Sequence, residues 1–207
     1  MKRNWKTCFL ATTILAATFG FGPTTHEESV MADTQRSIAE VLALLATNSK
    51  GLISAQDLRD TVVTLQPSLG NSYLSGKVET NLTVEGTYVK LAGNTDEGYL
   101  KRFSSLGHLD LIYSGAAVCQ AHVIASFAIS GETDMQLGFQ LALNDTLLPA
   151  TYQVVMIPGA DKYVAVTLVG SVELSTNDQI TVWGACLNGT GNITCKSFTM
   201  QATGHPK

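Results

Sequence analysis

The chain is poor in charge, and this shortage excludes several classes of function. Charged residues make up 14% of its 207 residues, with 13 Lys+Arg against 17 Asp+Glu and a net charge of −4. A protein that binds nucleic acid or anionic lipid needs a basic face, and this balance supplies none. A surface kept soluble mainly by Ser, Thr, Asn and Gly is typical of β-rich extracellular modules and virion proteins.

Motifs for catalysis and for metal binding are also missing. The sequence contains no GxSxG, Walker A, GxGxxG or HExxH pattern. The histidines lack ligand spacing with one another or with cysteine; they are His26, His108, His122 and His205. We therefore expect no enzyme, no cofactor and no metal centre.

Two less favoured functions, calcium binding and glycoside hydrolysis, depend on acidic residues that are scattered along the sequence. A calcium loop normally brings more carboxylates than the turns here offer. Glycoside hydrolysis needs two acids placed on one groove, and nothing in the sequence selects such a pair. The residues concerned are Glu132 and Asp134 with Asn144 or Asp145 for calcium, and Asp161 with Glu173 for hydrolysis.

The longest apolar run lies near the N-terminus. Three basic residues precede a run from Cys8 to Phe21, which is too short and too rich in Thr and Gly to span a membrane. Two interpretations stay open: a secretory leader, or an upstream extension ahead of a start at Met31. In both, residues 1–30 lie outside the fold. The remaining cysteines, Cys119, Cys186 and Cys195, have no CxxC spacing and predict neither a zinc site nor a dense disulfide framework.

Residues 31–66 predict two short amphipathic helices. Asp33 or Thr34 is a candidate cap for the first, and Ser54 with Asp57 has the spacing of a capping box for the second, which Pro67 ends. Some thirty residues cannot bury two apolar stripes alone, so we expect this segment to attach to a neighbouring copy or to another subunit. The stripes consist of Ile38, Val41, Leu42 and Leu45, then Leu58, Val62 and Leu65.

A helix-turn-helix reader of DNA would have a similar helical pattern. The second helix, however, carries Asp57 and Asp60 against a single Arg59. Contact with phosphate requires the opposite sign, so the docking interpretation is favoured.

Residues 67–106 contain five glycines and several short β-prone runs. Runs this short make poor isolated strands. We expect a neck of linker and irregular β structure in which several chains supply each other's partners.

From residue 107 the pattern changes to strands broken by turn signals, which predicts an antiparallel β-sandwich or jelly roll over 107–207. Asp110, between two leucines, is expected on the outward face of its strand. The expected strands lie near 108–114, 119–130, 135–144, 150–157, 162–174, 178–187 and 192–203.

The last two strands allow a register to be predicted. If Thr190-Gly191 is a two-residue loop, Trp183 faces Phe198 and Cys186 faces Cys195. The two cysteines are then either a cross-strand disulfide or, more in keeping with common usage, a pair of buried thiols.

Two segments carry a family resemblance. "FAISGETDMQLGFQLALNDTLLPAT" and "DKYVAVTLVGSVELSTNDQITVWGACLNGTGNITCKSFTMQATG" resemble the tumour necrosis factor-like jelly rolls that end many phage fibres and head-decoration proteins. The opening "MADTQRSIAEVLALLATNSKGLISAQDLRDTVVTL" is similar to that of many phage structural proteins. The resemblance implies a homotrimer formed through the sandwich, with the N-terminal part attached to the virion.

The resulting hypothesis is a virion structural protein, either a trimeric head fibre or decoration protein or a tail-fibre component. Its partners are copies of itself and, through residues 31–66, the capsid or fibre base; whether the sandwich binds a host-surface glycan or simply covers capsomers stays open. A secreted trimeric ligand is the alternative, and the Asn-x-Thr sequons at Asn81, Asn144, Asn188 and Asn192 would then bear glycans. Candidates for core or interface are the aromatic residues Tyr113, Phe127, Phe139, Tyr152, Tyr163, Trp183 and Phe198.

Overall fold

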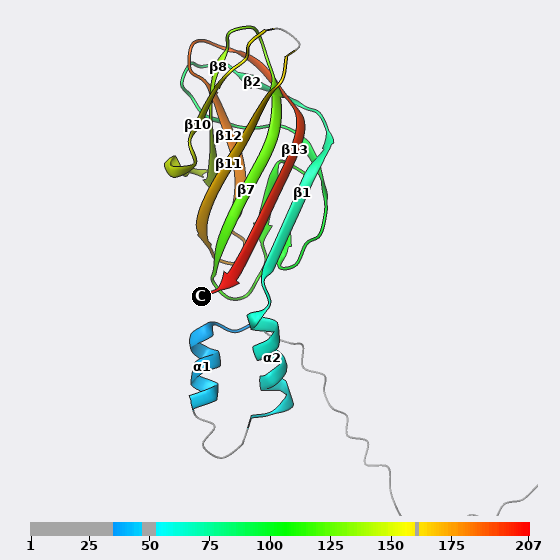
Figure 1. Ribbon diagram of the computed structural model, residues 1–207, viewed down its shortest axis with the longest axis vertical. Coiled ribbons are helices and arrows are strands. Elements are labelled where there is room, and N and C mark those ends of the chain that lie inside the picture. The colour runs from blue at the N-terminus through cyan, green and yellow to red at the C-terminus, as the bar shows by residue number, and fades with distance from the viewer. Residues whose placement is uncertain (1–34, 47–52, 160–161) are drawn as a thin grey trace, which may run out of the picture. The chain divides into compact units, whose positions relative to one another are not determined.

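The computed structural model describes residues 35–46, 53–159 and 162–207 (Figure 1). Our expectations for the leader, for the caps Asp33 and Thr34, and for Asp161 lie outside these residues. The helices are α1 (Ile38–Ala46) and α2 (Ala55–Leu65), and a short 3-10 turn, η1, covers Pro149–Thr151. The strands are β1 (Ser68–Gly76), β2 (Glu79–Leu82), β3 (Val89–Lys90), β4 (Asn94–Glu97), β5 (Phe103–Ser104), β6 (Asp110–Tyr113), β7 (Cys119–Ser130), β8 (Gln136–Leu143), β9 (Thr146–Leu147), β10 (Gln153–Met156), β11 (Val164–Leu174), β12 (Gln179–Cys186) and β13 (Gly191–Pro206).

The strands pair as if the chain were folded into one long antiparallel hairpin and the hairpin were then rolled up. β1 pairs with β13, β6 with β12, β7 with β11 and β8 with β10, all antiparallel. Two further pairs, β7 with β13 and β8 with β12, join the strands into two sheets. Sheet A has the order β11-β7-β13-β1-β4, and sheet B has the order β10-β8-β12-β6-β5. This nested antiparallel order is that of a jelly roll, which confirms the expected fold class. Figure 1 shows β11, β7, β13 and β1 side by side in one layer.

The core fills the space between the sheets. Inward positions alternate with outward ones along β7 and β11, as the sequence pattern predicts. Phe127 of sheet A meets Phe139 of sheet B edge to face at 5.2 Å between ring centroids, and Phe198 lies 6.4 Å from Phe127. All three rings are buried, so they belong to the core of a single chain.

Residues 68–76 differ from our expectation of an irregular neck. They form β1, which pairs with β13 from Ser68↔Gly204 to Tyr73↔Thr199 inside sheet A. The sequence pattern hides this strand because small residues occupy its inward positions. A side chain at Gly70 would come within 2.8 Å of the Phe103 ring, so large residues from the facing sheet fill that space instead.

The expected pairing of the last two strands is wrong. β12 lies in sheet B and β13 in sheet A, so Trp183 does not face Phe198. Trp183 pairs instead with Gln140 and with Lys90. The chain between these strands crosses from one sheet to the other, whereas the prediction assumed a turn within one sheet. Cys186 and Cys195 are therefore on different sheets, and both are free and buried.

Capping interactions begin both helices. The predicted box at α2 is confirmed: the Ser54 hydroxyl accepts a hydrogen bond from the Asp57 amide, and the Asp57 carboxylate accepts one from the Ser54 amide. At α1 the same reciprocal pair is formed by Ser37 and Glu40 rather than by an earlier residue. Hydrogen bonds from Ser54 lower the pKa of Asp57, and those from Ser37 lower that of Glu40. Pro67 follows the C-cap of α2, as predicted.

Candidate interaction surfaces

The middle rows of the outward face of sheet A carry no charged side chain, and Glu173 of β11 lies in the row beyond them at one end. In register, Val169, Ile124, Gln201 and Asn71 form one row across β11, β7, β13 and β1. The rows on either side are Thr167, Ser126, Thr199 and Tyr73, and Ser171, His122, Thr203 and Leu69. None of these residues is Asp, Glu, Lys or Arg, although nearly all are at least partly exposed.

A low density of charge is one property of surfaces that a partner covers. An ordinary soluble surface carries roughly 25–35% charged residues, and depletion of charge is what distinguishes the centre of a protein–protein interface. Strands spaced about 4.8 Å apart and advancing about 3.4 Å per residue give four strands of ten residues an area of roughly 650 Å². A stable interface of standard size takes about 800 Å² from each partner. The outward face of sheet A is therefore large enough to form most of one side of an interface.

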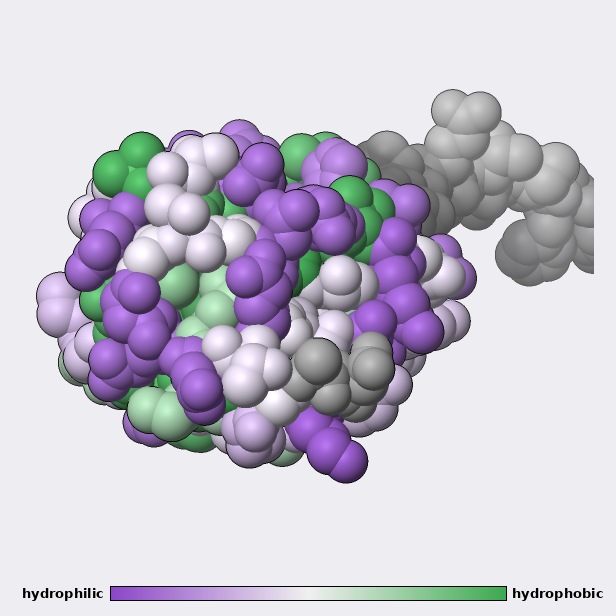
Figure 2. Space-filling model, turned by 90° about the horizontal axis from the view of Figure 1, so that it is seen from above, coloured by the Kyte–Doolittle hydropathy of each residue, from purple (hydrophilic) through white to green (hydrophobic). Residues whose placement is uncertain are grey.

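Figure 2 shows the molecule from above. This view looks along the vertical axis of Figure 1 and not onto sheet A; hydrophilic residues are spread over the visible surface, and the hydrophobic areas are separate rather than gathered into one patch. Tyr163 and Lys196 line a small polar depression of about 120 Å³ together with Asn192. The Lys196 ammonium lies 6.0 Å from the centre of the Tyr163 ring.

The predicted aromatic candidates separate into two groups. Phe127, Phe139 and Phe198 belong to the core described above. Tyr152 and Tyr163 are exposed, and Trp183 is half-buried with its indole N–H donating to the Thr181 hydroxyl at 2.9 Å. Of the predicted set, Tyr152, Tyr163 and Trp183 are therefore the ones available at the surface.

A second surface is the apolar stripe of α2, formed by Leu58, Val62 and Leu65. These side chains are 60%, 50% and 61% exposed, and Leu42 of α1 is 59% exposed. The spacing i, i+4, i+7 places the α2 residues on one face of the helix. Of the residues predicted in α1, Val41 is buried and Ile38 half-buried, while the side chain of Leu45 lies outside the described part.

The opposite face of α2 is polar and buried, which sequence reasoning missed. Asp60 and Thr64 are 2% and 0% exposed. The Arg36 guanidinium lies 2.7 Å from the Asp60 carboxylate, and the Arg36 amide donates to the Thr64 hydroxyl at 2.8 Å. Gln56 donates a further hydrogen bond to Asp60 at 2.7 Å. The helix thus makes its contacts within the chain through polar groups and leaves its apolar side to solvent.

Arg102 joins the end of α2 to the sandwich. Its guanidinium donates to the Gln66 carbonyl at 2.7 Å and to the Val63 carbonyl. A cation at the carboxyl end of a helix satisfies carbonyls that lack helical partners and complements the helix dipole.

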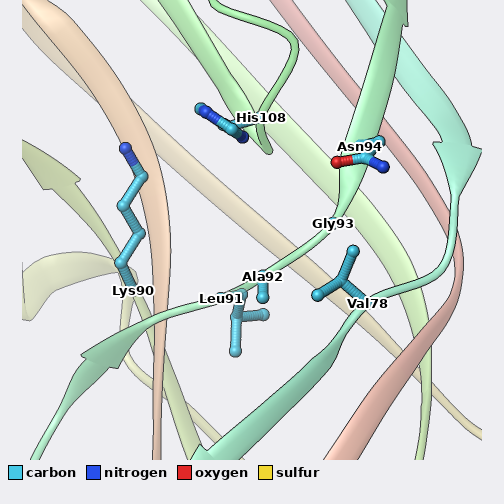
Figure 3. A pocket seen from close by; sticks show the side chains of 7 residues that line it. All are labelled: Val78, Lys90, Leu91, Ala92, Gly93, Asn94 and His108. Atoms are coloured by element: carbon cyan, nitrogen blue, oxygen red, sulfur yellow. The ribbon is translucent and has the colours of Figure 1, made fainter.

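A pocket of about 370 Å³ lies where the chain crosses from sheet B to sheet A, between β3 and β4. Its apolar lining comes from Val78, Leu91 and Ala92. Lys90, Asn94 and His108 supply its polar groups, and Figure 3 shows the Lys90 chain extending toward the side on which His108 lies.

The acids considered for metal binding and hydrolysis are dispersed. Asp134 precedes β8 while Asn144 and Asp145 follow it, so the strand separates the two halves of the calcium alternative. Glu173 forms an ion pair with Lys207. Within residues 35–46, 53–159 and 162–207, no group of three His, Cys, Asp or Glu could hold a metal ion.

Asp110 differs from our expectation of an outward, solvated position. It is 0% exposed, and its carboxylate accepts hydrogen bonds from Ser105, Leu106 and Gln179. A carboxylate can be buried when its oxygens are satisfied in this way.

Three of the four sequon amides already make structural hydrogen bonds. Asn188 donates to the Asp134 carbonyl at 2.8 Å and accepts from the Gln136 amide at 2.8 Å. Asn144 and Asn192 donate to Asp178 and Glu79, respectively. These asparagines therefore stabilise turns and strand ends.

No helix in the described ranges is long and apolar enough to cross a membrane. No protein-family model matches the chain, and no curated protein matches its sequence.

Solved structures with similar strand arrangements include murine APRIL at pH 5.0, with 10% identity and a TM-score of 0.45 over 67% of this chain and 98% of that chain. Eiger TNF from S. frugiperda has 11% identity and a TM-score of 0.46, and the match covers 66% of this chain and 92% of that chain. The PRD1 vertex protein P5 has 7% identity and a TM-score of 0.39, and the match covers 67% of this chain and 96% of that chain. By its own strand pairings, this chain has a jelly-roll fold.

Proposed function

We propose that this chain is a structural protein of a virion, which forms a homotrimer through the outward face of sheet A. It serves as a head fibre, a decoration protein or a tail-fibre component. The observation that carries the proposal is the absence of strongly charged residues from the rows centred on Val169 and Ile124. Each copy covers this face of the next copy around a three-fold axis, as the resemblance to tumour necrosis factor-like jelly rolls implies.

Residues 31–66 attach the trimer to the capsid or fibre base. The exposed stripe of Leu58, Val62 and Leu65 supports this role, because a helix that keeps its polar side inward has its apolar side free for a partner. The Arg36–Asp60 contact holds α2 in that orientation.

The sequon asparagines serve as turn residues in this role, since the Asn188 and Asn144 side-chain amides donate hydrogen bonds to Asp134 and Asp178.

The trimer is tested by the mass of the full chain in solution, measured by light scattering. We expect about three times the 22.0 kDa of one chain. Val169→Lys should dissociate the trimer, because it places a charge in the centre of the covered face. The matched control is Val154→Lys on β10 of sheet B, since Val154 and Val169 are 42% and 47% exposed.

A monomeric wild-type chain would refute the trimer, and dissociation by Val154→Lys alone would place the interface on sheet B. The virion role is tested separately by quantitative mass spectrometry of purified virus particles whose genome encodes the sequence. The chain should be present in multiples of three, and its absence from the particles would refute the role.

A further inference from the structure

We propose that the pocket between Lys90 and His108 binds a carboxylate-bearing sugar unit. The inference rests on the proposed function, to which it adds the class of surface glycan that the trimer would recognise. The crossover segment that carries Lys90 and Asn94 is held by two adjacent backbone amides. The Leu91 amide donates to the Val182 carbonyl at 2.9 Å, and the Ala92 amide donates to the Thr80 hydroxyl at 2.8 Å.

The size of the pocket fits a single sugar ring. Ligand pockets range upward from about 300 Å³, and this one encloses about 370 Å³. Val78 and Ala92 offer an apolar surface for the face of the ring that bears C–H groups. Leu91 is 2% exposed and belongs to the core, which makes that side of the pocket rigid.

The polar groups select a monoanion. Lys90 contributes one ammonium, and within the ranges that the structure describes no carboxylate forms an ion pair with it. A lysine holds a carboxylate or a phosphate as a point charge, and a single ammonium balances the one charge of a carboxylate but not the two of a phosphate dianion. The pocket has neither an arginine nor a helix N-terminus along its lining.

Asn94 and His108 provide the hydroxyl contacts. An amide both donates and accepts hydrogen bonds, and a neutral imidazole does the same through its two nitrogens. The two residues are bridge partners in the backbone, and Figure 3 shows the His108 ring between Lys90 and Asn94 in this view. A ligand that carries one carboxylate at Lys90 and hydroxyls toward Asn94 and His108 satisfies all three groups.

The test is saturation-transfer NMR with the full chain. The probes are the methyl glycosides of N-acetylneuraminic acid and of glucuronic acid, with neutral methyl glucoside as the control sugar. We expect roughly millimolar dissociation constants for one or both acidic sugars and no transfer to the neutral sugar. Lys90→Met keeps the apolar stem and should weaken binding about tenfold, because one charge-assisted contact is lost. Lys162→Met, at an exposed lysine outside the pocket, should leave binding unchanged.

Two results would overturn the inference: neither acidic sugar binds, or Lys90→Met binds as well as the wild type. Displacement of the sugar by an equal concentration of inorganic phosphate would also overturn it, because the pocket would then select charge alone. The outcome is independent of the trimer test. Loss of sugar binding with the trimer intact refutes the pocket only, and sugar binding by a monomeric chain refutes the trimer only.

Discussion

Replacement of Asp110 by asparagine removes one acceptor from a carboxylate that is wholly buried beside sheet B. Oδ1 of Asp110 accepts hydrogen bonds from the Ser105 hydroxyl at 2.8 Å and from the Leu106 amide at 3.2 Å. Oδ2 accepts from the Gln179 side-chain amide at 2.6 Å. These bonds join the strand β6, the loop before it and the start of β12. The carboxylate therefore links β6 to the loop just before it and to β12, whose Gln179 lies 69 residues away in the chain.

The expected cost follows from the geometry at Oδ2. An asparagine keeps one oxygen for Ser105 and Leu106 but turns an NH2 group toward the NH2 group of Gln179. A hydrogen bond to a charged group contributes about 1.5–3 kcal/mol, and a buried donor left without a partner costs about 1–3 kcal/mol. Both figures describe the same contact, so we expect Asp110→Asn to lower the free energy of unfolding by about 1.5–3 kcal/mol, a large part of the roughly 5–15 kcal/mol of a typical domain.

The assay is urea-induced unfolding followed by tryptophan fluorescence at a fixed chain concentration, since association contributes to apparent stability. Gln179→Glu alone should also destabilise, because two carboxylates then face each other. The double variant Asp110→Asn/Gln179→Glu reverses the donor and acceptor and should recover a large part of the loss. Asp96→Asn, at an exposed position on β4, is the control and should change stability by less than about 0.5 kcal/mol.

A loss below about 0.5 kcal/mol for Asp110→Asn would show that the hydrogen bonds are not made as described. Strict additivity in the double-mutant cycle would show that Asp110 and Gln179 do not interact.

Three further predictions concern other sites. Asn188→Ala removes the bonds to two backbone groups and should cost about 1–3 kcal/mol in urea unfolding; a neutral result would contradict the turn role of this asparagine. Gly70→Ala places a Cβ 2.8 Å from the buried Phe103 ring and should cost about 1–3 kcal/mol by overpacking, whereas Phe103→Leu in the same background should relieve part of the loss. Burial raises the pKa of Cys195 to about 12, while the unfolded chain releases this proton near its ordinary value of about 8.5. The thiol's contribution to stability is therefore complete below about pH 8.5 and is lost as pH rises toward 12. Between about pH 8 and about pH 10, the free energy of unfolding should therefore fall less in Cys195→Ala than in the wild type.

The strands that could be predicted are those in which large apolar residues alternate with polar ones. β7 was predicted with the bounds that the structure has, because Val123, Phe127 and Ile129 mark its inward side. β1 could not be predicted, because the residues it turns inward include Ser68, Gly70 and Ser72. Its place in sheet A is specified by side chains elsewhere, above all the Phe103 ring opposite Gly70.

The pairing of strands was harder to predict than their positions. A two-residue turn at Thr190-Gly191 normally pairs the strands on either side of it as a hairpin. No local sequence signal shows that the chain instead passes to the other sheet after β12. Whether the chain passes to the other sheet depends on which other strands each sheet contains. The burial of Asp110 was missed for a similar reason, since its partner Gln179 is 69 residues away.

The candidate surfaces were predicted in part. The α2 stripe and the capping box were evident from spacing around Ser54 and Leu58, whereas the Arg36–Asp60 contact was not. The uncharged middle rows of sheet A appear only when β1, β7, β11 and β13 are placed in register. The interface roles proposed for Tyr152, Tyr163 and Trp183 stay predictions.

The position of β13 has a consequence for biosynthesis. It is the last strand in chain order, yet it lies between β1 and β7 and bonds to both. During translation the ribosome releases its two neighbours long before β13 itself, so both wait with open edges that could capture strands of other nascent chains. Sheet A thus closes only after residues 191–206 have been synthesised.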